Sequence, residues 1–102
     1  MFIIDIHYIA PLEEVDRHME SHVAYLKKYF ESNMLIISGK KMPRTGGILI
    51  ANAGSRDEVE KIITEDPFYQ YKVAEMTITE FTHARHNVVL DELLGKSIWY
   101  WL

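Results

Sequence analysis

The sequence contains no cysteine, and only three of its 102 residues are proline and five are glycine. The absence of cysteine excludes disulfide bonds, thiolate nucleophiles and cysteine-ligated zinc. Long hydrophobic runs are also absent from the N-terminal segment, where the apolar start at Met1 meets a charge at Asp5. This segment is too short for a membrane span or a signal peptide, so we expect a cytoplasmic protein that does not enter a membrane.

Positive charge is scarce as well. Lysine and arginine number 11 against 15 aspartates and glutamates, which gives a formal net charge of −4. The lysine pairs at 27–28 and 40–41 form no extended basic stripe, and a surface that binds nucleic acid must neutralise phosphates. We therefore expect no nucleic-acid partner. The 48% hydrophobic content is that of a folded globular chain, and the length fits a single domain.

Alternating side chains predict a first strand over residues 2–9. One face of this strand is wholly apolar or aromatic and is expected to meet the core: Phe2, Ile4, Ile6 and Tyr8. A helical period follows over residues 13–31, after Pro11, and Asn33 is a plausible end for it. One stripe of this helix is expected to face the core: Val15, Met19, Val23, Leu26 and Phe30.

The middle of the chain predicts a hairpin and a second helix. Residues 35–39 and 48–52 have strand composition and are close enough in sequence to pair as an antiparallel hairpin. Ser55 and Glu58 have the spacing of a capping box, which marks the start of a helix. This helix is expected to end before Pro67, because proline disfavours helical geometry at the residue that precedes it.

A further helical turn over residues 68–72 and a fourth strand over 74–81 complete the pattern. The order β-α-β-β-α-β predicts a ferredoxin-like α+β fold with an antiparallel sheet. We place this domain at residues 1–83 and an extra C-terminal segment at 84–102.

The C-terminal segment differs from the domain in composition. A short helix is expected within residues 83–95, where His83 and His86 lie in a polar stretch and are expected to be solvated. Residues 98–102 are all large and apolar or aromatic, and such a run rarely stays in water. We expect it to pack on the chain's own sheet or on a partner subunit, with a lid over a ligand as the alternative.

His22 is the one titratable residue inside the apolar stripe of the first helix. A buried imidazole loses hydration and needs a hydrogen-bond partner, so the pattern alone favours a hydrogen-bonded core histidine. His18 lies four residues earlier, a spacing that can bind a metal from one helix face. No motif for a third ligand follows, so we expect no metal site.

Asp66 and Ser38-Gly39 also have structural interpretations. An aspartate before proline commonly caps the helical turn that follows, here near Phe68. Ser38 lacks the strand–elbow–helix context of a nucleophilic serine. Gly39 would simply allow backbone or a ligand to approach closely.

Taken together, these residues resemble the YciI-like (YCII-related) family of the dimeric α+β barrel group. The resemblance covers residues 1–83 and rests on landmarks in the family's order: the Ile- and aromatic-rich first strand, His22 followed by Leu26, Ser38-Gly39, and Asp66-Pro67-Phe68. It implies a ferredoxin-like protomer that forms a homodimer through its sheets. It also implies an active site in which His22 and Asp66 match the family's histidine and aspartate.

The function that this resemblance implies is a cofactor-independent lyase or isomerase acting on a small metabolite, because one branch of the family removes chloride from a chlorinated hydroxyquinone. His22 would be the general acid/base and Asp66 its orienting partner. We expect substrate contacts from residues around this pair: Ser38, Gly39, Arg44, His7 and Phe68.

The basic loop at residues 40–44 departs from the family pattern. Lys40, Lys41 or Arg44 could offset negative charge on an enolate or carboxylate substrate. Two other functions stay open: a non-catalytic small-ligand-binding or accessory dimer module, and a cofactor-free monooxygenase, by analogy with other dimeric α+β barrels.

Overall fold

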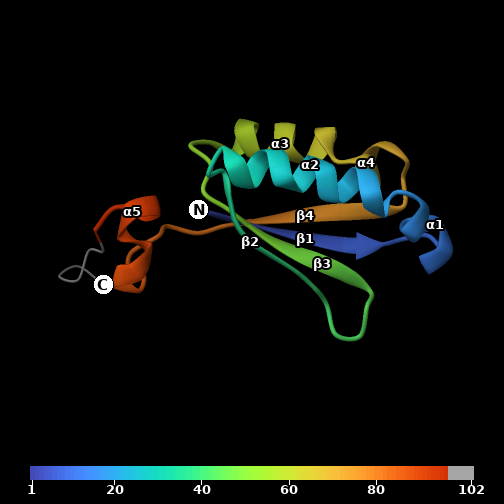
Figure 1. Cartoon of the computed structure of the whole chain (residues 1–102), viewed down its shortest axis with the longest axis horizontal. Helices are drawn as coiled ribbons and strands as arrows, with labels where there is room; N and C mark the ends of the chain where they lie inside the picture. The colour runs from blue at the N-terminus through green and yellow to red at the C-terminus, as the bar shows by residue number, and fades with distance from the viewer. Residues whose placement is uncertain (97–102) are drawn as a thin grey trace.

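The computed structural model describes residues 1–96 and has an α+β architecture in the order βααββααβ (Figure 1). The four strands are β1 (Phe2–Tyr8), β2 (Leu35–Lys40), β3 (Gly46–Ala51) and β4 (Ala74–Glu80). The helices of the domain are α1 (Leu12–Arg17), α2 (Met19–Glu31), α3 (Arg56–Glu65) and α4 (Pro67–Gln70). A 3₁₀ turn, η1 (Val88–Leu90), and α5 (Asp91–Leu94) follow the last strand.

The strands form one antiparallel sheet in the order β2-β3-β1-β4, which confirms the predicted ferredoxin-like fold. At its centre, Ile4 lies opposite Leu49 on β3 and Ile78 on β4. The domain helices cover one face of the sheet (Figure 1), and the core lies between these two layers. Phe2, Ile4 and Ile6 are buried there as predicted, because alternate residues of a strand point to the same face.

The helix expected over residues 13–31 is two helices, α1 and α2, which meet at His18. The backbone of His18 lies at φ −104° and ψ 5°, and its N–H donates to the carbonyl of Val15 in a tight turn. The core stripe is also rotated from the predicted one. Val23 is 53% exposed, whereas His22 and Tyr29 are buried. A helical period defines an arc of residues, but only the position of the sheet decides which part of that arc is covered.

Local signals at the helix ends are confirmed. The Ser55 hydroxyl accepts from the N–H of Glu58, and the Glu58 carboxylate accepts from the N–H of Gly54, one residue earlier than in a standard capping box. The α2 helix ends at Glu31, and the positive φ of 64° at Asn33, the expected stop, prevents further helical propagation.

Two glycines of β3 have a strict steric role, Gly46 and Gly47; a Cβ atom on Gly47 would lie 2.9 Å from the carbonyl oxygen of Gly39. A Cβ atom on Gly46 would lie 1.8 Å from the carbonyl oxygen of Ile6, so β1 and β3 pair here only because residue 46 has no side chain. Apart from Gly39 and its two neighbours in sequence, no residue of the described chain has an atom within 4 Å of the corresponding position at Gly39. Close backbone approach therefore requires glycine at Gly46 and at Gly47, and the approach of a ligand at Gly39 stays a prediction.

The C-terminal arm, residues 83–96, extends away from the sheet and the helices (Figure 1). The expectation that His83 and His86 are solvated is wrong for His86, whose side chain is 5% exposed and bonded to Asp91. The arm folds on itself through the bonds of His86 to Asp91 and to His83, and a polar composition does not predict this burial. The prediction for residues 98–102 lies outside the described residues.

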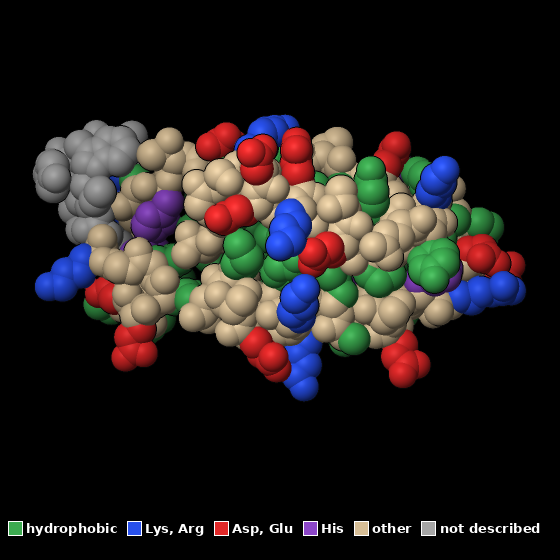
Figure 2. All heavy atoms as spheres, turned by 90° about the horizontal axis from the view of Figure 1, so that it is seen from above, with side chains coloured by type: hydrophobic (Ala, Val, Ile, Leu, Met, Phe, Trp, Pro, Cys, Tyr) green, Lys and Arg blue, Asp and Glu red, His purple; other side chains and the backbone are tan. Residues whose placement is uncertain are grey.

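None of the helices among residues 1–96 is long and apolar enough to cross a membrane. Seen from the helix side, acidic and basic side chains of the described residues are interspersed, with no basic stripe across this face (Figure 2).

Candidate active site

A pocket of about 360 Å³ lies between α2 and the β2–β3 hairpin, on the helix-covered side of the sheet. Its size is that of a site for a small organic molecule. Fourteen residues from β1, α2, β2, the β2–β3 loop, β3 and α4 line it: Ile6, Tyr8, Met19, His22, Val23, Leu26, Ser38, Gly39, Lys40, Arg44, Gly46, Gly47, Leu49 and Phe68.

His22 and Asp66 meet at the helix side of this pocket. The Nδ1 atom of His22 lies 2.8 Å from Oδ1 of Asp66, across 44 positions of sequence. Both side chains are almost fully enclosed, at 8% and 1% exposed. Because the carboxylate can only accept, Nδ1 carries the hydrogen and donates it. In the tautomer with its hydrogen on Nδ1, the lone pair is on Nε2.

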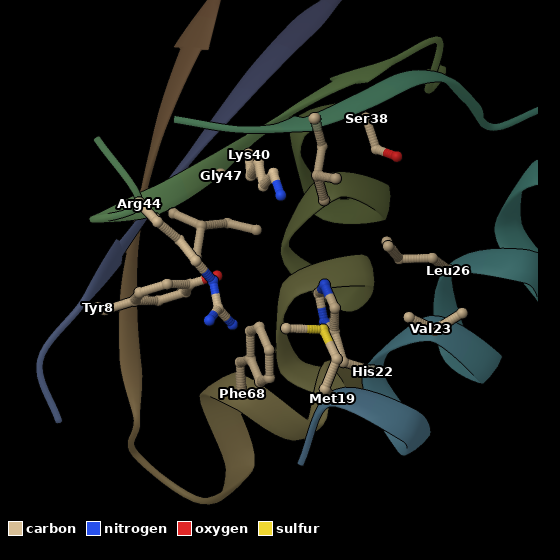
Figure 3. Close-up of a pocket in the computed structure, with 14 residues that line it drawn as sticks. Tyr8, Met19, His22, Val23, Leu26, Ser38, Lys40, Arg44, Gly47 and Phe68 are labelled. Atoms are coloured by element: carbon tan, nitrogen blue, oxygen red, sulfur yellow. The ribbon is translucent and has the colours of Figure 1, made fainter. Parts of the chain in front are cut away.

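Nε2 is the ring nitrogen that a ligand can reach. It makes no hydrogen bond to any described residue, and within residues 1–96 no side-chain nitrogen or oxygen is both buried and without a partner. Nε2 is therefore accessible, and the lining position of His22 directs that access into the pocket (Figure 3).

Asp66 also caps the helical turn that follows it. Its Oδ1 atom accepts from the backbone N–H of Phe68 at 2.9 Å while accepting from His22. The cap and the histidine pair are not alternatives, because one carboxylate oxygen has two lone pairs. The Asp66-Pro67-Phe68 sequence thus builds the pair directly: Pro67 starts α4, Asp66 caps it, and Phe68 stacks on His22 with ring centroids 3.9 Å apart.

Two tyrosines of α2 support the pair from behind. The Tyr25 hydroxyl donates to the carbonyl of Ile62 at 2.5 Å, and the Tyr29 hydroxyl donates to the carboxylate of Glu65. Burial raises the pKa of Tyr25 far above its ordinary value, and the negative charge of Asp66 raises it further. The pKa of Tyr29 is raised to about 12, first by burial and then by the bond to Glu65. Both phenols are therefore protonated at neutral pH and tie α2 to the end of α3.

The hairpin supplies the charged wall of the pocket. Arg44 Nη2 lies 2.5 Å from Oδ1 of Asp16, and its guanidinium stands 5.9 Å from the ring centre of Tyr8. This bond lowers the pKa of Asp16 and raises that of Arg44, so the pair is ionised. Lys40 lines the same wall, and Lys41 instead contacts Asp5 at 2.6 Å.

Six of the seven residues predicted for the site come together, and one does not. Five line the pocket: His22, Ser38, Gly39, Arg44 and Phe68. Asp66 stands behind His22 rather than on the pocket surface. His7 is exposed on the opposite face of the sheet, since it alternates with the core-facing Ile6, and the structure does not bring it to the pair.

Eight lining residues are not among those that the sequence analysis proposes for the site: Ile6, Tyr8, Met19, Val23, Leu26, Gly46, Gly47 and Leu49. Tyr8 could have been found, because it ends the core-facing series of the first strand and an inward aromatic at a strand end reaches past the core. Met19 was assigned to the core stripe, and periodicity does not separate a pocket wall from a core wall.

Comparison with known proteins decides the family. A model of the YCII-related domain matches residues 1–82. The chain belongs to the YCII-related family. Among solved structures, it resembles 5-chloro-2-hydroxyhydroquinone dehydrochlorinase from Burkholderia phenoliruptrix AC1100, in a complex with 2,5-dihydroxybenzoquinone, with a TM-score of 0.69 and 23% identity. The match covers 85% of this YCII-related chain and 99% of the dehydrochlorinase, and at this identity it establishes the shared fold. No curated protein shows significant similarity to the chain.

Proposed function

We propose that this YCII-related protein is a cofactor-independent lyase or isomerase that moves a proton on a small metabolite. The observation that carries the proposal is the enclosed His22–Asp66 bond at 2.8 Å, with the second ring nitrogen open to a pocket. An imidazole whose Nδ1 hydrogen is held by a carboxylate is oriented for acid/base work through Nε2.

In this mechanism His22 Nε2 removes a proton from a carbon beside a carbonyl group of the substrate. The C–H electron pair becomes an enolate, and the charge of Asp66 stabilises the imidazolium that forms. In an isomerase His22 returns the proton to another substrate atom. In a lyase the enolate electron pair forms a carbon–carbon double bond as a leaving group such as chloride departs from the adjacent carbon with its own electron pair. The dehydrochlorinase that shares the fold supports the lyase variant.

A non-catalytic ligand-binding module is the second candidate, and one observation favours it. Asp66 already has a structural role as the cap of α4, and Phe68 packs on His22, so the pair also stabilises the fold. In that case the pocket binds a ligand and the pair merely shapes its wall.

We also infer a homodimer formed through the uncovered face of the sheet, as the family implies. Isoleucines lie on this face beside its polar residues, and Ile37 is 55% exposed. Burying such residues would stabilise a domain of this size. Light scattering is expected to give twice the chain mass, and a monomer at micromolar concentration would contradict this inference.

The proposal is tested by a screen for proton exchange. Small enolisable acids and chlorinated hydroxyquinols are incubated in deuterated water, and loss of carbon-bound proton signal is followed by NMR. We expect His22→Gln to lower the rate at least about 100-fold, the usual minimum for a general acid/base. The matched control is His18→Gln, on the neighbouring turn but stacked on Tyr71 with centroids 4.1 Å apart. Equal rates for wild type and His22→Gln would overturn the proposal and favour the non-catalytic ligand-binding module.

A further inference from the structure

Three cations lie on the β2–β3 hairpin, and their surroundings differ. Lys41 is paired with Asp5, whose side chain is on the uncovered face of the sheet, because Asp5 alternates with the buried Ile4 and Ile6. Arg44 is paired with Asp16 at the pocket rim. Lys40 lines the pocket, and its side chain makes no ion pair or hydrogen bond to any residue of the described chain.

Strand geometry accounts for this division. Successive residues of a strand point to opposite faces, so neighbouring lysines at the end of β2 reach opposite sides of the sheet. Lys40 lies opposite Gly47 on β3, which has no side chain to compete for the same space. The hairpin therefore presents one ammonium group to the pocket and leaves room beside it.

The opposite wall supplies the reacting group. Figure 3 shows Lys40 and Arg44 extending into the pocket from the hairpin side, with His22 and Phe68 across from them. The walls between the two sides are apolar: Ile6, Met19, Leu26 and Leu49. A ligand that satisfies this arrangement has an apolar body, a negative group at one end and an acidic C–H bond at the other.

We propose that Lys40 binds the carboxylate of the substrate and that the pocket selects monocarboxylic acids with an apolar body. A single ammonium group complements a single negative charge, whereas a phosphate carries close to two. Arg44 does not supply a second unpaired charge, because Asp16 neutralises it. The placement of the reacting carbon at His22 rests on the proposed function, whereas the binding role of Lys40 does not.

The test measures binding without turnover. Calorimetry compares 2,5-dihydroxybenzoate with its methyl ester, which has the same ring but no charge. Wild type is expected to bind the carboxylate at least about tenfold more tightly, as a charge-assisted hydrogen bond predicts. In Lys40→Met this preference is expected to disappear.

Two matched controls remove one positive charge elsewhere. Lys41→Met changes the adjacent lysine on the other face, and Lys27→Met changes an exposed residue of α2. Both are expected to keep the wild-type preference. Equal affinity of wild type for the two probes, no binding of 2,5-dihydroxybenzoate at millimolar concentration, or the same loss in Lys41→Met as in Lys40→Met would each overturn the proposal.

Failure of this inference and failure of the proposed function are distinguishable. His22→Gln retains Lys40 and is expected to keep the preference for the carboxylate. A preserved preference together with no proton exchange on any acid would sustain the role of Lys40 and reject the lyase or isomerase. The opposite result is proton exchange that depends on His22 and is unaffected by Lys40→Met, on acids and esters alike. That result would sustain the lyase or isomerase and reject the role of Lys40.

Discussion

Two imidazole–carboxylate pairs in this molecule have the same length and a different construction. His22 Nδ1 lies 2.8 Å from Asp66, and His86 Nε2 lies 2.8 Å from Asp91. The first pair joins two helices across 44 positions, whereas the second joins residues five positions apart in the C-terminal arm, with His83 Nε2 2.8 Å from His86 Nδ1.

The difference teaches that the length of such a bond does not identify a reactive centre. The second pair forms from local chain geometry. The first requires the sheet, α2 and α4 to be in place, and its histidine lines a pocket that five other elements help to build. A bond that depends on the whole fold and ends at a cavity is the stronger candidate for chemistry.

The largest expected effect comes from the aromatic ring beneath the first pair. Phe68 is 1% exposed and stacks on His22, so Phe68→Ala is expected to lower the free energy of unfolding by about 3–5 kcal/mol. Val88 in the arm is 74% exposed, and Val88→Ala should change the free energy of unfolding by no more than about 0.5 kcal/mol. Urea unfolding measures both. Similar midpoints for the two variants would refute the distinction between the regions.

Substitution of the two carboxylates, Asp66 and Asp91, should also destabilise the first region more than the second, but by a smaller difference in unfolding free energy. Asp66→Ala removes a helix cap and leaves two enclosed donors, on His22 and Phe68, without their acceptor. We expect a loss of about 2–4 kcal/mol from the cap and the unpaired donors together. Asp91 is one-third exposed, so Asp91→Ala should cost about 1 kcal/mol or less. Thermal and urea unfolding test this order, which a larger loss for Asp91→Ala would reverse.

The smallest effect concerns pH, because the first region includes buried phenols and residues 83–91 include no tyrosine. The pKa of Tyr29 is raised from its ordinary value of 10 to about 12 by burial and by Glu65. A raised pKa means that the folded state holds its proton more tightly. The stability from this group is complete below pH 10 and is lost as pH rises towards 12. Tyr29→Phe should flatten the fall in unfolding free energy across this window, and an unchanged slope would contradict the assignment.

Much of the fold could be predicted from the sequence because its signals are local. Alternation placed Phe2, Ile4 and Ile6 in the core, and the capping residues at Ser55 and Asn33 marked helix ends. The break at His18 could not be predicted, because no proline or glycine stands there. Nor could the exposure of Val23, which depends on where α2 sits against the sheet.

The candidate site was less accessible to sequence reasoning. Asp66 as a cap and Asp66 as a partner of His22 looked like alternatives, but one carboxylate oxygen accepts both bonds. The sequence offers no reason to distinguish Lys40 from Lys41. In the structure the side chain of Lys40 lines the pocket, whereas that of Lys41 contacts Asp5 on the opposite face of the sheet. His7 could have been set aside, because the alternation that buries Ile6 turns His7 away from the pocket.

The most direct test of the central claim, that His22 and Asp66 act as one unit, is a double-mutant cycle on kcat/KM. It uses the best substrate from the proton-exchange screen and compares wild type, His22→Gln, Asp66→Asn and the double variant, in which asparagine keeps an oxygen to cap α4. We predict that the double variant is no slower than His22→Gln within about twofold, because residues that act as a unit have non-additive effects. Losses that multiply, or an equal loss in His86→Gln, would contradict the account.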